Sequence, residues 1–373
     1  MANGPKLNGK EASPAGERGT RSRRGSSTAA LAKRLGLRLA AREELTIRRR
    51  RAGKGFVYLD PGGARIADAG IVRRLASLAV PPAYEDVLYA GDPKAHLQAI
   101  GRDAAGRLQY RYHPEWEKVR EMRKASRIAR FAESLPRIRR SLGKHLGPGE
   151  PTREFALASV IELVALSAIR PGGENHARLR GTRGAATLLK SNVKVDGATV
   201  ILCFRAKGGK KVQKEFRAAR LCAAIEVLRT VPGKRLFQYR QANGEVRSAS
   251  ARAVNIFLRE IAGVQISLKD FRTLLASVSV LDALSRETPA DSKRARRRQV
   301  LEAIRAAADD LSNTPTICAK SYVHETVVNA FEDGALEQFA ETLKGCRSPA
   351  RREKALADVL ATATMSAATI EAA

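Results

Sequence analysis

The most apolar stretch of the chain, residues 154–169, repeats large apolar side chains every three or four positions. The repeated positions are Leu157, Val160, Ile161 and Val164. This spacing places them on one face of an α-helix. The sequence Pro171-Gly172-Gly173 ends the pattern directly after Arg170, because proline and glycine both interrupt helices. The pattern therefore predicts a helix with Arg170 at its C-terminal end.

Residues 192–216 follow a different pattern, in which apolar and polar side chains alternate. A period of two predicts β-strands, and turns at Asp196-Gly197 and Gly208-Gly209 divide the segment into three short strands. Lys207 then lies at the tip of the second hairpin. Helical spacing resumes at about Ala218. These patterns predict a larger, mainly α-helical domain that contains a three-stranded sheet.

Two segments of the N-terminal third carry strand and turn signals. Residues 55–68 indicate a strand, a Pro-Gly-Gly turn and a second strand, and residues 96–116 indicate two strands around a glycine-containing turn. Within the second segment, alternation places Tyr110 and Tyr112 on the same face of a strand. We therefore expect a small antiparallel β-rich domain, and the α+β class for the whole chain.

The composition divides the chain into four parts. Residues 1–40 are rich in Gly, Ser, Ala and Arg, which predicts a disordered basic arm. We expect the β-rich domain over residues 41–122, the helical domain over residues 123–345 and a C-terminal tail helix over residues 346–373. Residues 1–54 hold fifteen Lys and Arg against four Asp and Glu. The sequence leaves open whether this arm serves solubility or adds attraction to phosphate.

The net charge indicates the kind of partner. With 68 Lys and Arg against 38 Asp and Glu, the formal charge is +30 at pH 7. Such an excess favours a polyanionic partner, and nucleic acid is favoured over a membrane surface because no basic amphipathic helix or lipidation signal accompanies the charge. No apolar stretch is long enough to span a membrane, and the N-terminus lacks a secretory signal. We expect a cytoplasmic protein that shares its compartment with the nucleoid.

Cysteine and histidine give no metal-binding pattern in the sequence. The four cysteines are scattered without a C-x-x-C pair, and the five histidines do not lie at ligand spacing. We therefore expect reduced thiols and no metal site.

Five polar residues stand where the predicted structure changes or beside apolar side chains. They are Arg170, Lys207, Arg272, Asn313 and Tyr322. Each has an ordinary structural explanation when taken alone: an arginine near a helix C-terminus complements the helix dipole, and a lysine in a glycine-rich turn is usually solvated. Arg272 is harder to explain in this way, because it lies in an otherwise apolar helix and a buried unpaired guanidinium is costly.

Taken together, the motifs that carry these residues form a recognisable set. The segments "SAIRPGGENHA", "CFRAKGGKK", "LKDFRTLLASV" and "NTPTICAKSYVH", in this order, resemble the catalytic motifs of type IB DNA topoisomerases of the poxvirus-like bacterial branch. The segments "PPAYEDV" and "HLQAIGRDAAGRLQYRYHPEW" resemble the N-terminal domain of the same family. The resemblance extends from about Gly55 to about Val328.

The resemblance implies a role for each of the five residues. The two arginines of the family fall on Arg170 and Arg272, its hairpin lysine on Lys207, its His-or-Asn position on Asn313 and its nucleophile on Tyr322. A tyrosine phenolate that attacks phosphorus conserves the energy of the phosphodiester in a 3′-phosphotyrosyl bond. Guanidinium forks match the charge that gathers on the nonbridging oxygens.

The same resemblance implies further roles. Asn313 donates a hydrogen bond to the phosphate, and Lys207 is the general acid, with Lys210 and Lys211 as nearby competitors. It also implies that neither ATP nor a divalent metal is needed. The protein is then a monomer that closes as a clamp around double-stranded DNA and relaxes supercoils of either sign.

Three residues outside this set resemble DNA contacts of the family, and a fourth, His176, occupies the position of such a contact. Tyr110 and Tyr112 resemble its aromatic pair in the N-terminal domain, and Lys269 resembles a basic residue three positions before the second arginine. His176 stands where many relatives have tyrosine, and Leu274 stands where bacterial relatives often have tryptophan. The histidine puts a DNA contact at that position in doubt, whereas the leucine changes only packing.

Two other functions fit part of the sequence. A tyrosine recombinase shares the arginine-and-tyrosine chemistry, but recombinases usually carry histidine where this chain has Lys269, and their second domain is helical. A nonenzymatic nucleoid-type DNA-binding protein explains the charge but gives no reason for five matched positions. The sequence therefore favours the topoisomerase.

Overall fold

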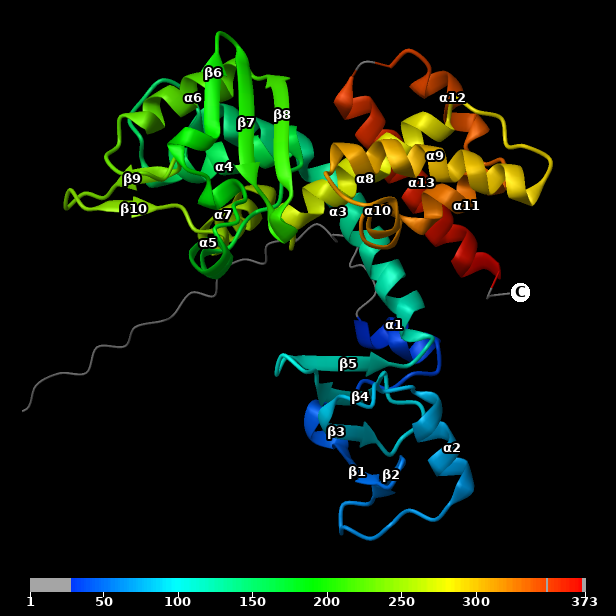
Figure 1. The fold of residues 1–373 in the computed structure, drawn as a ribbon. Helices are drawn as coiled ribbons and strands as arrows, with labels where there is room; N and C mark the ends of the chain where they lie inside the picture. The colour runs from blue at the N-terminus through cyan, green and yellow to red at the C-terminus, as the bar shows by residue number, and fades with distance from the viewer. Residues whose placement is uncertain (1–27, 347, 371–373) are drawn as a thin grey trace, which may run out of the picture. The chain divides into compact units, whose positions relative to one another are not determined.

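The computed structural model describes residues 28–346 and 348–370 of the 373-residue chain. These residues divide into two compact units, the first ending at Trp116 and the second beginning at Glu117 (Figure 1). The first 27 residues of the predicted basic arm lie outside the described residues.

The first unit is built on an antiparallel sheet. Its described elements are α1 (Thr28–Arg34), β1 (Leu45–Ala52), β2 (Gly55–Leu59), α2 (Ala69–Ser77), β3 (Glu85–Ala90), β4 (Leu97–Arg102) and β5 (Leu108–Tyr112). The strands follow the order β2-β1-β3-β4-β5. The predicted pair of strands in residues 96–116 is confirmed as β4 and β5, with Ile100 opposite Tyr110 and Leu97 opposite Tyr112.

Two expectations for the first unit were wrong. We expected disorder up to residue 40, but Thr28–Arg34 is a helix. Its Leu31 and Ala32 are buried, and this burial stabilises the helix although the apolar run is short. The segment 55–68 forms a single strand, β2, followed by an isolated bridge between Leu59 and Arg65 in place of a second strand.

The second unit is mainly helical. Its helices are α3 (Trp116–His145, whose first residue closes the first unit), α4 (Arg153–Ser167), α5 (Glu174–Arg180), α6 (Ala219–Arg229), α7 (Ala251–Ala262), α8 (Leu268–Leu284), α9 (Lys293–Asp310), α10 (Pro315–Ser321), α11 (Glu325–Glu332), α12 (Glu337–Leu343) and α13 (Pro349–Ile370). A three-stranded antiparallel sheet has the order β6-β7-β8, and β9 and β10 form a separate pair. The strands are β6 (Val193–Asp196), β7 (Thr199–Arg205), β8 (Lys211–Arg217), β9 (Gln238–Arg240) and β10 (Val246–Ser248). The predicted three-stranded sheet is therefore confirmed.

Helix α4 occupies the centre of the second unit. It is buried on nearly every side, as expected for a helix that is apolar all round. It lies against α6, α7, α8 and β8. Because α4 is fixed by these neighbours, the residues that follow it are held firmly as well.

The C-terminal segment is helical, as expected for residues 346–373, but it is more than a tail. Helix α13 lies against α8 and α11, and its Leu356 and Leu360 are buried in the core of the unit. Apolar side chains at helical spacing explain this packing. None of the helices in residues 28–346 and 348–370 is long and apolar enough to cross a lipid bilayer.

Candidate active site

Arg170 follows the C-terminus of α4. The helix begins at Thr152, whose hydroxyl accepts a hydrogen bond from the backbone N–H of Phe155, and it ends at Ala168, which adopts a left-handed conformation with φ of 54°. This turn directs the chain away from the helix axis, and Arg170 is half-buried two residues later. The predicted position of Arg170 at a helix end is therefore confirmed.

Arg272 lies in the first turns of α8. The helix starts with a capping box in which the carboxylate of Asp270 accepts hydrogen bonds from the backbone N–H and the hydroxyl of Ser267. The buried Asp270 carboxylate also forms an ion pair with Arg127 of α3 at 3.1 Å. These contacts fix the start of α8 and therefore the position from which Arg272 extends.

The Arg272 guanidinium joins the ends of two helices. Only 1% of the residue is exposed. Its Nη1 donates to the carbonyl of Ala168 at the end of α4, and its Nη2 donates to the carbonyl of Leu311 at the end of α9 at 3.0 Å. Its Nε is buried without a hydrogen-bond partner among the described residues. Burial lowers the pKa of this guanidinium, and the neighbouring Tyr322 acts in the opposite direction.

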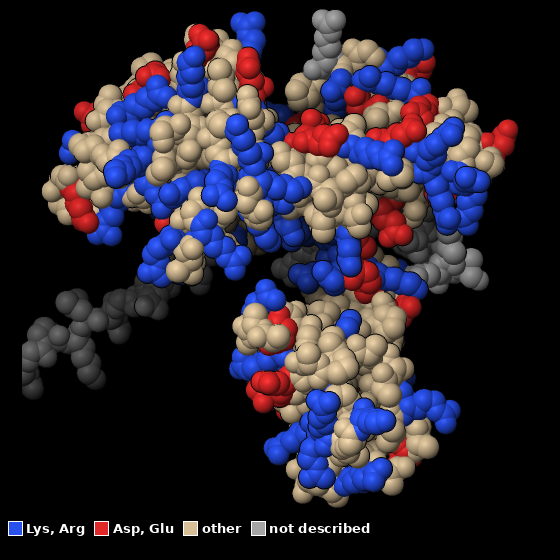
Figure 2. Space-filling model, viewed as in Figure 1, with Lys and Arg blue, Asp and Glu red and all other residues tan. Residues whose placement is uncertain are grey.

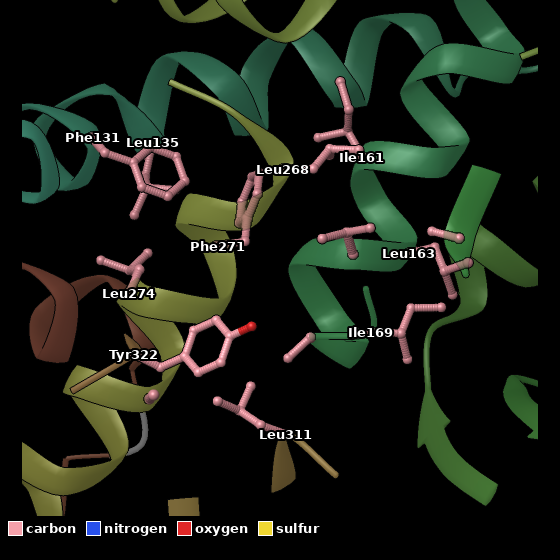
Figure 3. Close-up of a cluster of buried hydrophobic side chains, with 14 of the residues drawn as sticks. Phe131, Leu135, Ile161, Leu163, Ile169, Leu268, Phe271, Leu274, Leu311 and Tyr322 are labelled. Atoms are coloured by element: carbon pink, nitrogen blue, oxygen red, sulfur yellow. The ribbon is translucent and has the colours of Figure 1, made fainter. Parts of the chain in front are cut away.

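Tyr322 lies beside Arg272. It caps the C-terminus of α10, is 8% exposed, and places its ring 4.8 Å from the Arg272 guanidinium carbon, measured to the ring centroid. Figure 3 shows the ring among apolar side chains that include Phe271 and Leu311. Burial raises the pKa of Tyr322, but the charges of Arg272, Arg170 and Lys269 outweigh it and lower the pKa below its ordinary value. The phenol is thus packed in the core and also lies among cations that favour its ionised form.

Asn313 connects the loop before α10 to Arg170. Its Oδ1 accepts a hydrogen bond from Nη2 of Arg170 at 2.5 Å. Its Nδ2 is buried and has no hydrogen-bond partner in the described part of the chain. The residue before it, Ser312, has a φ of 50°, which turns the chain sharply between α9 and α10. The structure therefore brings Arg170, Arg272, Asn313 and Tyr322 together.

The backbone around Tyr322 is held by residues that the sequence did not reveal. The hydroxyl of Ser277, on α8, donates to the carbonyl of Tyr322 and accepts from the N–H of His324, both at 3.2 Å. Lys124 of α3 donates to the carbonyl of Val323 at 3.2 Å. Three consecutive residues are thus tied to two helices, so the segment that contains Tyr322 is held in place.

Lys207 is the only exposed residue of the five. It opens the turn Lys207–Gly209 at the tip of the β7–β8 hairpin, as predicted, and its side chain is exposed. Within the described chain, no hydrogen bond or ion pair joins it to Tyr322 or to either arginine. Its competitors Lys210 and Lys211 are exposed as well. The described hydrogen bonds and ion pairs therefore tie none of the three lysines to the tyrosine.

A fourth lysine of the hairpin does reach the site. Lys214, on β8, is half-buried and donates to the carbonyl of Asp310 at the end of α9. Burial lowers the pKa of Lys214 and Arg272 lowers it further, while Asp310 acts in the opposite direction. Alternation along β8 could have found this residue, because it places Lys214 on the same face as the buried Val212.

The predicted DNA contacts lie in both units. In the first unit, Tyr110 and Tyr112 are stacked with ring centroids 6.1 Å apart, as alternation predicted, and Tyr112 also stacks on Trp116 at 6.2 Å. The Arg42 guanidinium lies over the ring of Tyr110. Sequence reasoning missed Arg42 and Trp116, although aromatic residues spaced through a basic segment were a usable signal.

In the second unit, His176 is exposed on α5 and Lys269 is exposed in the first turn of α8. Figure 2 shows Lys and Arg side chains gathered over α5 and the neighbouring ends of β7 and β8.

Residues 28–346 and 348–370 contain no group of three or more His, Cys, Asp and Glu side chains that could hold a metal ion.

Comparisons with known proteins identify the family. Residues 113–348 match the family described as "Eukaryotic DNA topoisomerase I, catalytic core", and residues 55–103 match "Bacterial DNA topoisomerase IB, N-terminal domain". The chain is 27% identical over 294 residues to the DNA topoisomerase 1B of Acanthamoeba polyphaga mimivirus, which covers 77% of this chain and 88% of that protein. The match decides against a recombinase and against a nonenzymatic DNA-binding protein. The chain belongs to the type IB DNA topoisomerases, isomerases that bind DNA and change its topology.

Proposed function

We propose that this enzyme relaxes supercoiled DNA by transesterification at Tyr322. The observation that carries the proposal is the Arg272 guanidinium 4.8 Å from the centroid of the Tyr322 ring, in a setting that lowers the pKa of the phenol. A phenolate is the nucleophilic form of tyrosine, so a lowered pKa increases the reactive fraction near neutral pH.

In the first step, the Tyr322 oxygen attacks the scissile phosphorus and the bond from phosphorus to the 5′ oxygen breaks. The product is a 3′-phosphotyrosyl link and a free 5′ hydroxyl. Arg170 and Arg272 stabilise the charge on the nonbridging oxygens, and the free Nδ2 of Asn313 donates a further hydrogen bond. The broken strand then swivels about the intact one.

In the second step, the 5′ hydroxyl attacks the phosphotyrosyl phosphorus and releases Tyr322. Lys207 donates the proton to the leaving 5′ oxygen during cleavage and removes it during religation. For this role the exposed β7–β8 hairpin moves toward the bound phosphate, and the turn residues Gly208 and Gly209, both with positive φ, allow that movement. The bond energy is conserved throughout, so the reaction needs neither ATP nor a divalent metal.

The two units form a clamp around duplex DNA in this proposal. Tyr110 and Tyr112 contact the duplex from the β-rich unit, and Lys269 and His176 contact it from the helical unit. The exposed positions of Tyr112, Lys269 and His176 support these contacts. One chain supplies every catalytic group, so the enzyme acts as a monomer.

Plasmid relaxation tests the proposal. Negatively and positively supercoiled plasmids are incubated without ATP and with excess EDTA, using wild type, Tyr322→Phe and the control Tyr239→Phe. Tyr239 lies in the same unit on β9, so its substitution removes a hydroxyl outside the site. Wild type and Tyr239→Phe relax both plasmids, and Tyr322→Phe relaxes neither. Relaxation by Tyr322→Phe at the wild-type rate would refute the assignment of the nucleophile.

A further inference from the structure

Arg183 occupies a glycine-flanked turn that the assigned catalytic residues do not include. The turn, "GTRG", covers residues 181–184 and follows α5. The backbone N–H of Arg183 donates to the carbonyl of Arg205, at the end of β7, at 2.7 Å. This bond anchors the turn to the strand that leads into the Lys207 hairpin.

The next residue, Gly184, locks the turn against Arg170. A Cβ atom at position 184 would lie 2.5 Å from the carbonyl oxygen of Arg170, which is too close. Only glycine, which has no Cβ atom, fits at this position. The N–H of Ala185 donates to the same carbonyl at 2.8 Å. Arg183 is therefore held in a fixed position relative to Arg170, although thirteen positions separate them in sequence.

Arg183 shares a small pocket with three other cations. Arg170, Arg183, Lys214 and Arg272 all line it, together with Ser312 and apolar side chains. None of the described residues that line the pocket is acidic. Arg272 is buried, and its Nε has no hydrogen-bond partner in the described chain. We call these four residues the cation pocket.

The charge of the cation pocket is only partly compensated. Asp310 acts on Lys214, and Arg170 is bound to the neutral Asn313. Arg183 is half-buried, and within residues 28–346 and 348–370 its side chain makes no ion pair or hydrogen bond. Positive side chains that lie close together and are partly removed from water repel one another unless an anion is present. We therefore expect an anionic ligand in this pocket.

We propose that Arg183 is a further catalytic residue, which binds a nonbridging oxygen of the scissile phosphodiester alongside Arg170 and Arg272. A phosphodiester supplies the single negative charge and the planar pair of oxygens that guanidinium forks match. The scissile phosphate is favoured over a neighbouring one because Arg272, which borders the same pocket, lies over the Tyr322 ring. This inference rests on the proposed role of Tyr322.

Single-turnover cleavage tests the inference. The substrate is an end-labelled duplex built around the strongest cleavage site mapped with wild type, and enzyme is saturating. The variants are Arg183→Ala, Arg183→Lys, Tyr322→Phe and the control Arg217→Ala. Arg217 is exposed on the same sheet, paired with Thr199 at the end of β8 opposite the Lys207 hairpin. We expect Arg183→Ala to cleave about 10²-fold more slowly, Arg183→Lys to recover part of the loss, and Arg217→Ala to stay within about threefold of wild type.

A neutral phosphate separates direct contact from a structural effect. With a methylphosphonate at the scissile position, the charge that Arg183 binds is absent, so the difference between Arg183→Ala and wild type should fall to below about tenfold. With the methylphosphonate at the next position, the full difference should remain. The inference would be overturned if the full rate difference between Arg183→Ala and wild type remained with the methylphosphonate at the scissile position. It would also be overturned if that difference disappeared only with the methylphosphonate at the next position.

The two proposals fail in different ways. If Arg183→Ala cleaved as fast as wild type while Tyr322→Phe were inactive, only the role of Arg183 would be lost. If Tyr322→Phe formed the covalent product, the proposed site itself would be wrong. Arg183→Lys retains the charge and the stem of the side chain, so it gives an answer even where alanine disturbs the turn.

Discussion

The Oδ1 atom of Asn313 accepts a hydrogen bond from Arg170 at 2.5 Å, while its Nδ2 atom is buried without a partner in the described chain. One side chain thus orients a guanidinium and keeps a donor free at the same place. An unpaired buried donor is unfavourable in the free protein, and in the proposed reaction this donor gains a partner when a phosphate oxygen binds.

Asn313→Asp tests this double role. The carboxylate keeps the shape of the side chain and its bond to Arg170, but it replaces the free donor with negative charge. We expect cleavage at saturating enzyme to slow by about 10²-fold or more, and by more than in Asn313→Ala, because the carboxylate repels the phosphate. Single-turnover rates of both variants check this order. Equal rates for Asn313→Asp and wild type would show that Nδ2 does not face the phosphate.

The hydroxyl of Ser277 holds the nucleophile segment. Ser277→Ala removes the hydrogen bonds to the Tyr322 carbonyl and from the His324 N–H. We expect the free energy of unfolding to fall by about 1–3 kcal/mol and cleavage to slow by about tenfold, with DNA affinity unchanged. Urea denaturation, single-turnover cleavage and filter binding measure the three quantities.

Ser279→Ala is the matched control for that variant. Ser279 lies on the same helix and is half-buried, and no hydrogen bond joins its side chain to the nucleophile segment in the described residues. If Ser277→Ala lost stability but cleaved as fast as Ser279→Ala, the hydroxyl would stabilise the fold without positioning Tyr322.

The pH dependence of cleavage should report the lowered pKa of Tyr322. Where the phenolate is the reactive form, the rate rises with pH and levels off above the pKa. Lys269 is one of the cations that lower this pKa. Lys269→Met should therefore move the point of levelling to higher pH. Single-turnover rates across the alkaline range measure the shift. The control is Lys293→Met, whose lysine is the first residue of α9 and lies at the end of that helix away from Asn313. Coinciding profiles would mean that Lys269 does not act on the phenol.

His324 should make stability depend on pH. Burial, and to a smaller extent the neighbouring charge of Lys124, lower its pKa from an ordinary 6.5 to about 4, and a hydrogen bond with the backbone of Glu121 acts in the opposite direction. Below pH 6.5, His324 binds a proton in the unfolded chain but stays neutral in the folded chain until the pH approaches 4. The free energy of unfolding should therefore fall as pH drops, by about 3 kcal/mol in all by pH 4.

His324→Gln should remove that part of the pH dependence. Denaturation followed by circular dichroism between pH 4.5 and pH 7 compares it with wild type and with His176→Gln, whose histidine is exposed. The wild type and His176→Gln should lose stability in parallel, and His324→Gln should lose less. Parallel curves for all three proteins would contradict a buried neutral His324.

Local patterns predicted much of the fold and part of the site. The β6–β7–β8 sheet and the position of Arg170 followed from periodicity and turn residues, because these depend on neighbours in sequence. Strand β1 was missed, since a run of four arginines at positions 48–51 hides its alternation. The helix over Thr28–Arg34 was missed because its stability depends on contacts made elsewhere in the unit.

The contacts that complete the site could not be found in this way. Ser277 reaches Tyr322 from 45 positions away, and Gly184 places Arg183 beside Arg170 by a close backbone approach that no pattern records. Motif resemblance supplied the set of five residues but not their distances. It gave no indication that Lys207 is exposed while Lys214 lines a pocket together with Arg272.

Isolating the covalent adduct shows most directly whether Tyr322 becomes attached to DNA. Wild type is mixed with duplex DNA labelled on the 5′ side of the cleavage site, denatured and digested with protease, and the labelled peptide is sequenced by mass spectrometry. We expect one labelled peptide from wild type, joined through Tyr322 to the 3′ phosphate, and none from Tyr322→Phe. Label on another residue, or an adduct in Tyr322→Phe, would contradict it.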